Sequence, residues 1–138
     1  MKLYMGGPSQ PPCVGENNRK RRLPQATDED GKPLNFSWGD GSIDSARLAF
    51  AILRDALGND HEAWRYYMLF KVDPVQLWKA GEPWAISEDA VLQRVKRIRE
   101  VLDDAAKMRA IVDREARPVD VEAGGGVGRS RQDWEYGR

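Results

Sequence analysis

"NFSWGDGSIDSARLAFAILRDALG", residues 35–58, is the stretch that decides the fold. Ser42 is a favoured N-cap residue and Asp44 follows in the first turn, so the spacing predicts a helix that begins at Ser42. Gly58 is typical of a helix end, because glycine adopts the left-handed conformation without strain. Apolar residues cover more than half of the helix circumference, which predicts a helix central to the core. These residues are Ile43, Ala46, Leu48, Ala49, Ile52, Leu53, Ala56 and Leu57.

The glycine-rich loop before this helix raises the question of phosphate binding, because helix N-termini bind anions. The sequence contains no P-loop motif with its lysine and hydroxyl residue. A dinucleotide-binding loop needs a third glycine where this sequence has Asp44, whose carboxylate would repel a pyrophosphate. We therefore interpret Trp38, Gly39, Asp40 and Gly41 as mainly structural. The glycines form a tight turn, the tryptophan packs in the core, and the exposed aspartate is free to contact a partner.

The residues before this stretch predict a small β element. Alternation of apolar and polar residues predicts a short strand over Lys2–Met5. Prolines and charged runs predict a long loop over residues 6–33, with a strand around Arg19–Leu23 as an alternative. A turn and a second short strand are expected near residues 32–36.

The residues after Gly58 predict further helices. Asn59 and Asp60 are expected to cap a second helix, and Asp73-Pro74 is expected to open a short third one. Residues 82–86 read as extended, and Ser87 is a favoured N-cap residue followed by two acidic residues. Three tryptophans, Trp64, Trp78 and Trp84, lie among apolar positions and are expected in the core.

The last predicted helix, residues 87–117, carries an apolar stripe that follows alternating steps of four and three, interrupted by Arg109 and widened by Met108. At 1.5 Å per residue, a helix over Ser87–Ala116 is roughly 45 Å long. It is longer than a small domain can cover, so part of the stripe should need a cover, which is a second copy, another protein, or the domain itself through a fold-back. The predicted stripe consists of Val91, Val95, Ile98, Leu102, Ala105, Met108 and Val112.

Composition separates the chain into a small α+β domain at 1–92, the helix at 87–117, and a flexible tail at 118–138. The expected fold class is α+β, with a small N-terminal β element packed on a helical core. Within the tail, Trp134 and Tyr136 follow a glycine-rich segment. They are either part of a disordered end or a short docking motif.

Basic residues form the best feature for nucleic-acid binding. The run Arg19, Lys20, Arg21, Arg22 could neutralise several phosphates, and Arg94 and Arg97 form a second group. An acidic run follows the first group, and mixed-sign pairs surround the second, so solvated surfaces are the favoured interpretation. Nucleic-acid binding remains the alternative.

Composition also argues against disulfide formation, catalysis, metal binding and membrane insertion. The 22 Lys and Arg residues balance 22 Asp and Glu residues, so no overall field draws the chain to nucleic acid or membrane. One cysteine, Cys13, allows no intrachain disulfide, and one histidine, His61, offers neither a triad nor metal-ligand spacing. No apolar run could span a bilayer, and the N-terminus lacks a signal-peptide core. We expect a cytoplasmic, non-enzymatic protein without cofactor or metal.

The ordered pattern resembles a small uncharacterised domain family of phages, plasmids, bacteria and archaea. That family carries an F-x-W-G-Y-G-G-S-G-P-x-x-L-A-x-A-I-L signature. Matching residues here are Phe36, Trp38, Gly39, Gly41, Leu48, Ala49, Ala51, Ile52 and Leu53. "KLYMGG", "YYMLFK" and "WAISEDAV" resemble other family segments, so the similarity covers roughly residues 1–92. The family's G-S-G-P is replaced by residues 42–45, "SIDS".

The resemblance implies a fold and a mobile-element setting, and no reaction. The resulting functional hypothesis is a protein-interaction module, such as an inhibitor or adaptor that binds a host or defence protein complex. The alternative hypothesis is a nucleic-acid-binding accessory protein that uses residues 19–22 and 94–99.

Overall fold

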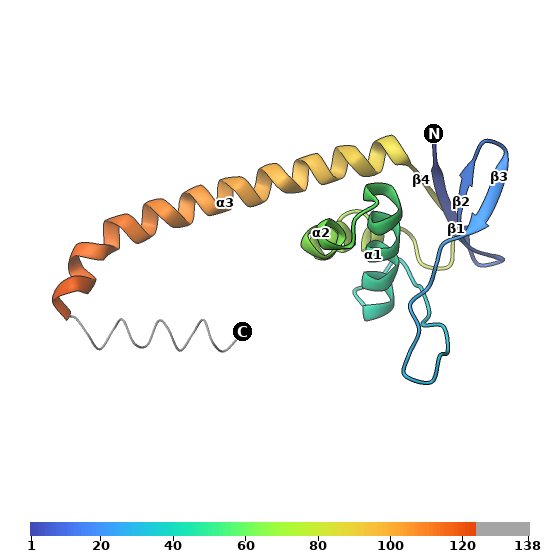
Figure 1. Ribbon diagram of the computed structural model, residues 1–138, viewed down its shortest axis with the longest axis horizontal. Helices are drawn as coiled ribbons and strands as arrows, with labels where there is room; N and C mark the ends of the chain where they lie inside the picture. Colours follow the sequence, from blue (N-terminus) through green and yellow to red (C-terminus); the bar gives the residue numbers. More distant parts are fainter. Residues whose placement is uncertain (124–138) are drawn as a thin grey trace. The chain divides into compact units, whose positions relative to one another are not determined.

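The computed structural model describes residues 1–123 of the chain, and the side chains of residues 1–115. The chain divides into two compact units, unit 1 at Met1–Arg99 and unit 2 at Glu100–Arg138. Unit 1 contains a four-stranded antiparallel sheet with helices packed on it, which confirms the predicted α+β class (Figure 1). Its elements in chain order are β1 Leu3–Gly7, β2 Gln10–Glu16, β3 Arg19–Arg22, α1 Ile43–Leu57, α2 Asp60–Val72, the short 3-10 helix η1 Val75–Leu77, β4 Trp84–Ser87 and the start of α3 Glu88–Ala123.

The sheet has the strand order β3-β2-β1-β4, so the first strand of the chain lies in its interior. Tyr4 of β1 pairs with Val14 of β2 on one side and with Ile86 of β4 on the other. Arg21 of β3 continues the same row beyond Val14. Residues that lie directly opposite one another project from the same face of a sheet. This row therefore marks the face that α1 covers, because Tyr4 and Arg21 both contact Asp55 of α1.

The predicted loop over residues 6–33 is wrong for its first half, where β2 and β3 form a hairpin. Asn17 and Asn18 make the turn with φ angles of 54° and 65°, the left-handed pair that two-residue hairpins require. Pro11 and Pro12 lie in β2 where its register with β1 shifts, and proline is tolerated at such irregularities. The alternative strand around Arg19–Leu23 is present as β3. The expected strand near residues 32–36 is reduced to a single bridge between Thr27 and Pro33.

α1 supplies the centre of the core, as predicted. Ser42 caps it by accepting a hydrogen bond from Ser45 N, and Gly58 ends it with φ of 66°. One side of α1 is fully buried, and α1 packs against α2. The largest buried side chains around it come from the sheet, α2, η1 and α3. They include Tyr4, Val14, Tyr66, Phe70, Val75 and Val91.

The remaining helices also follow the predicted caps. Asn59 caps α2, and Ser87 accepts a hydrogen bond from Ala90 N at the start of α3. The predicted short helix after Pro74 is η1. α3 extends to Ala123, past the predicted end at residue 117. Pro118 therefore lies within the helix, a position that a helix accommodates by losing a hydrogen bond and bending.

Candidate functional site

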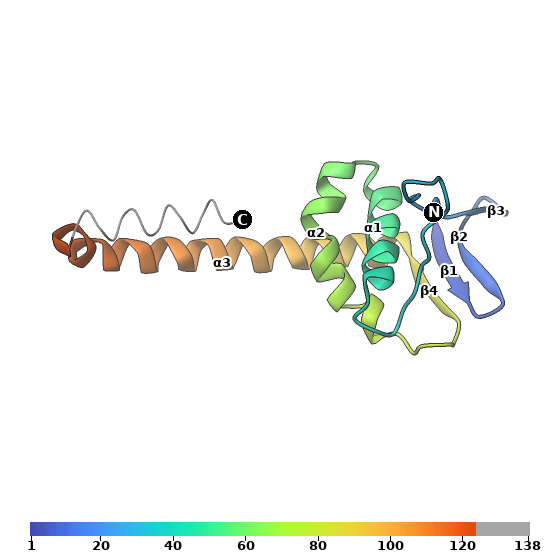
Figure 2. The ribbon, with the colours of Figure 1, turned by 90° about the horizontal axis from the view of Figure 1, so that it is seen from below.

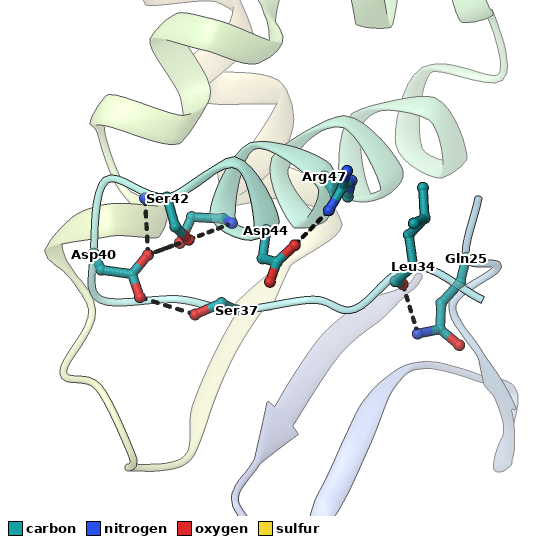
Figure 3. Close-up of polar contacts among 8 residues, drawn as sticks. Gln25, Leu34, Ser37, Asp40, Ser42, Asp44 and Arg47 are labelled. Carbon is teal, nitrogen blue, oxygen red and sulfur yellow. Dashed lines mark hydrogen bonds and ion pairs between the residues drawn. The ribbon is translucent and has the colours of Figure 1, made fainter. Parts of the chain in front are cut away.

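The loop of residues 37–42 before α1, called the corner below, is stabilised by hydrogen bonds to the Asp40 carboxylate (Figure 3). Its carboxylate accepts hydrogen bonds from the Ser42 backbone N–H at 3.0 Å and from the Ser42 hydroxyl at 2.6 Å. The hydroxyls of Ser45 and Ser37 donate to it at 2.7 and 3.0 Å. These bonds, from Ser42 above all, hold the pKa of the Asp40 carboxyl well below its usual range. A phosphate placed at this helix N-terminus would meet a carboxylate that already occupies the donors.

Gly39 and Trp38 pack this corner against the segment of residues 80–84. Gly39 has φ of +80°, and a Cβ atom there would lie 2.5 Å from the Ala80 backbone nitrogen. No other residue type fits such a close approach of two backbone segments. Trp38 is half-buried, donates through Nε1 to the Glu82 carbonyl, and meets Trp84 edge-on at 6.1 Å. The contacts of this loop are thus made within the chain, and Asp40 itself is exposed.

A second carboxylate, that of the half-buried Asp55, ties the end of α1 to the sheet. Tyr4 donates to it at 2.9 Å, Lys2 at 3.2 Å and Arg21 at 2.6 Å. Burial raises the pKa of the Asp55 carboxyl, but the hydrogen bonds from Arg21, Tyr4 and Lys2 outweigh it and leave the pKa lowered. Burial, followed by the bond to Asp55, raises the pKa of the Tyr4 hydroxyl. We interpret this cluster as a structural link between β1, β3 and α1.

The predicted nucleic-acid residues divide into two groups on different elements. Arg19, Lys20, Arg21 and Arg22 form β3, the edge strand, and all four are exposed. Arg21 forms an ion pair with Asp55 at 2.6 Å. The second group lies on α3, which follows β4 at the opposite edge of the sheet.

In that second group, Arg94 is ion-paired with Asp73 at 2.8 Å, whereas Arg97 is exposed. Arg99 donates to the Tyr66 hydroxyl at 3.0 Å. The strand order thus separates the two groups, so they do not form one basic strip. Arg94 and Arg99 instead connect α3 to α2 and to the residue that ends α2.

The predicted partner-binding stripe of α3 has two different surroundings. Val91, Val95 and Ile98 are buried within unit 1 and belong to its core. We therefore correct their predicted role, because a buried side chain cannot contact a partner without unfolding of unit 1. Leu102 is half-buried, and the later stripe positions Ala105, Met108 and Val112 are exposed. Val101 and Ile111 add to the exposed apolar surface.

The expectation that Trp64 belongs to the core is also wrong, since 62% of its surface is exposed. Trp84 is buried and Trp78 is half-buried, stacked on it with ring centroids 4.6 Å apart. The buried face of α2 consists of Ala63, Tyr66 and Phe70, which follow steps of three and four. Trp64 does not share this spacing, so it lies outside the buried face. That spacing is the signal that would have placed Trp64 correctly. Trp134 and Tyr136 lie outside the described residues.

The single cysteine and the single histidine of the chain lie on different elements, β2 and α2. Cys13 is buried, with the Gln10 amide 3.2 Å from its sulfur, and His61 is exposed. Within residues 1–123, no group of three or more His, Cys, Asp or Glu side chains is arranged to hold a metal ion. No helix in this part of the chain is both long and apolar enough to cross a membrane.

Comparison with protein families identifies the domain. The family model of DUF6166, a family of unknown function, matches residues 13–97, and the chain belongs to this family. The match begins in β2 and ends in the first part of α3, so it includes the corner, α1 and α2. A search of curated proteins found no match. A search of solved structures found none either.

Proposed function

We propose that this member of the DUF6166 family is a non-enzymatic protein-interaction module. In the mobile-element setting that the sequence resemblance implies, it would act in the host cytoplasm as an inhibitor or adaptor that occupies a surface of a host or defence complex. The observation that carries the proposal is the exposed apolar stripe of α3 beyond Arg99. Met108 and Val112 are 62% and 58% exposed there. Apolar side chains repeated along one helix face are a common surface for helix–helix association.

The partner that fits this stripe best is a second copy of the chain. Val101, Ala105, Met108 and Val112 follow steps of four, three and four, which is the spacing of d and a positions in a coiled coil. In this register Asp104 is a g position, and Arg109 is the e position five residues later. A parallel pair of helices therefore places Asp104 opposite Arg109 of the second copy, and the reverse. This opposite-charge match favours a parallel dimer.

Light scattering after gel filtration, with the full chain, tests whether this stripe associates with a second copy. We expect the native protein to be a dimer that dissociates on dilution, and Met108→Asp to be a monomer because it places a charge in the seam. Asp104→Arg and Arg109→Asp alone should each weaken the dimer, and the two together should restore it. Arg97→Gln, an exposed change on the same helix within unit 1, is the matched control. A native monomer, or a dimer that survives Met108→Asp, would refute self-association through this stripe.

A second candidate function, nucleic-acid binding, is favoured by one observation. β3 exposes four consecutive cations at the edge of the sheet. The variant that tests it replaces Arg19, Lys20 and Arg22 with alanine and retains Arg21, which bonds to Asp55. If this function holds, binding to labelled single- or double-stranded DNA should weaken strongly and its salt dependence should decrease. Equal binding by the variant would exclude the strand as a nucleic-acid surface.

A further inference from the structure

Unit 1 has an apolar groove on the side of α1 that faces away from the core. The groove encloses about 280 Å³ and is lined by α1, by α2 and by the segment after β3. Figure 2 shows α1 between α2 and that segment. Ile43 and Arg54 lie at the two ends of the α1 part of the lining, so the groove runs for roughly 16 Å along the helix.

The walls of this groove carry large apolar side chains that remain exposed. Ile43 is 66% exposed and Trp64 is 62% exposed. Trp64 and Tyr67 of α2 both contact Phe50 of α1, with ring centroids 4.9 and 6.0 Å apart. The three rings also hold one another in place, because Trp64 and Tyr67 meet edge-on at 5.2 Å. The surface is therefore ordered in advance, which lowers the entropic cost of binding a partner.

The lining of this groove contains two charged residues, Arg47 and Arg54. Arg54 lies over the Phe50 ring at 5.8 Å, and its ion pair with the exposed Asp60 is long, at 3.8 Å. Arg47 is paired with Asp44 at 2.5 Å, and Asp44 is outside the lining. Arg54 lies seven positions after Arg47 in α1, which corresponds to a rise of roughly 10 Å. The groove thus presents an aromatic surface between two cations.

We propose that this groove binds a short segment of another protein in which apolar side chains are flanked by two carboxylates. Tryptophan, tyrosine and arginine are the residue types that most often dominate protein interfaces, and all three line the groove. In an extended chain every second side chain lies on the same face, so carboxylates that share a face are roughly 7 Å apart at two residues and roughly 13 Å apart at four residues. The four-residue spacing suits the two arginines, because the residue midway between the carboxylates then also faces the groove. The apolar side chain midway between them would cover Phe50 and Trp64, and the carboxylates would contact Arg47 and Arg54.

The charges around the groove favour an acidic protein segment over nucleic acid. Two cations can satisfy two carboxylates, whereas a nucleic-acid backbone needs a longer run of cations. The volume is at the low end of the range of small-molecule pockets, which suits side chains better than a whole cofactor.

Selection from a random heptapeptide display library against the full-length protein tests this inference. We expect enriched peptides to share two acidic residues four positions apart, with an apolar residue midway between them. A fluorescent copy of the best peptide is then titrated by anisotropy. Arg47→Gln combined with Arg54→Gln, and separately Trp64→Ala, should each weaken binding roughly tenfold or more. Lysine in place of the acidic residues of the peptide should have an equal effect.

Three controls establish whether the peptide binds in this groove. Arg65→Gln changes an exposed arginine next to Trp64 that is outside the lining, and it should leave the peptide affinity unchanged. Met108→Asp should also leave it unchanged, so that failure of the α3 proposal and failure of the groove proposal can be told apart. Thermal unfolding of each variant confirms that its fold is intact. Absence of enriched peptides, enrichment without acidic residues, or displacement of the peptide by single-stranded DNA would overturn the inference.

Discussion

Residues Glu88–Arg99 and Glu100–Glu115 belong to one helix and carry similar apolar repeats, yet their side chains have different surroundings. In the first segment the stripe is covered by unit 1, and Val91 is completely buried. In the second segment the stripe positions Met108 and Val112 are exposed. The comparison of the two segments shows that periodicity identifies which side of a helix is apolar. It does not identify what covers that side, because the cover comes from residues that are distant in the sequence.

The largest expected effect would break this comparison if it failed. Val95→Asp should reduce the free energy of unfolding of unit 1 by about 3–5 kcal/mol, because it leaves an uncompensated charge in the core. Met108→Asp is the matched change in the exposed segment and should shift that free energy by no more than ~0.5 kcal/mol. Urea unfolding followed by tryptophan fluorescence measures both, at a protein concentration low enough for the native chain to be monomeric, because loss of a dimer would lower the apparent stability. Similar losses for the two variants would mean that the second segment is also part of the core.

A glycine pair sharpens the comparison within unit 1. Gly39 and Gly31 have nearly the same φ, +80° and +82°, but only Gly39 lies against another backbone segment. Gly39→Ala should destabilise unit 1 by at least ~2 kcal/mol, through the backbone strain and the overlap together. Gly31→Ala should cost about 1 kcal/mol, because it adds the strain alone. Thermal unfolding of the two variants separates these contributions. Equal losses of stability would show that the backbone around Gly39 moves to accommodate the added methyl group at little cost.

The smallest expected effect concerns the link between α1 and the sheet. Asp55→Asn should destabilise unit 1 by on the order of 1–2 kcal/mol at neutral pH, because Lys2 and Arg21 lose their charged partner. The folded pKa of Asp55 is lowered, so its contribution is present above the unfolded pKa near 4 and is lost as the pH falls through the folded value. The difference between native protein and variant should therefore shrink below pH 4. Urea unfolding at several pH values measures it, and a constant difference would contradict the ionic role.

Local signals were sufficient to predict most of the helical part of the fold. Ser42, Gly58, Asn59 and Ser87 lie at the caps where their residue types indicated them. Caps depend on hydrogen bonds to the nearest backbone groups, so the sequence next to the cap contains the information. β2 was missed because its prolines are typical of loops. The Asn17-Asn18 pair was the available signal for the hairpin.

The candidate sites were harder to predict, since each depends on elements far apart in the chain. The Asp55 cluster joins Lys2, Tyr4 and Arg21 to the end of α1. The groove joins α1 to α2 and to the segment after β3, and no local pattern marks such a meeting. Spacing alone does exclude Trp64 from the buried face of α2, and this is as far as the sequence could have led. What the DUF6166 match adds is common descent over residues 13–97, without a reaction or a partner.

The interior place of β1 has a consequence for how the protein is made. Leu3 pairs with Gly15 on one side and with Ser87 on the other. During synthesis the first edge of β1 can be satisfied almost at once, whereas the second stays unpaired until β4 has emerged. An unpaired strand edge is prone to bind other chains. We therefore expect β1 to need protection in the nascent chain until β4 has emerged, and refolding to be slow for a chain of this size.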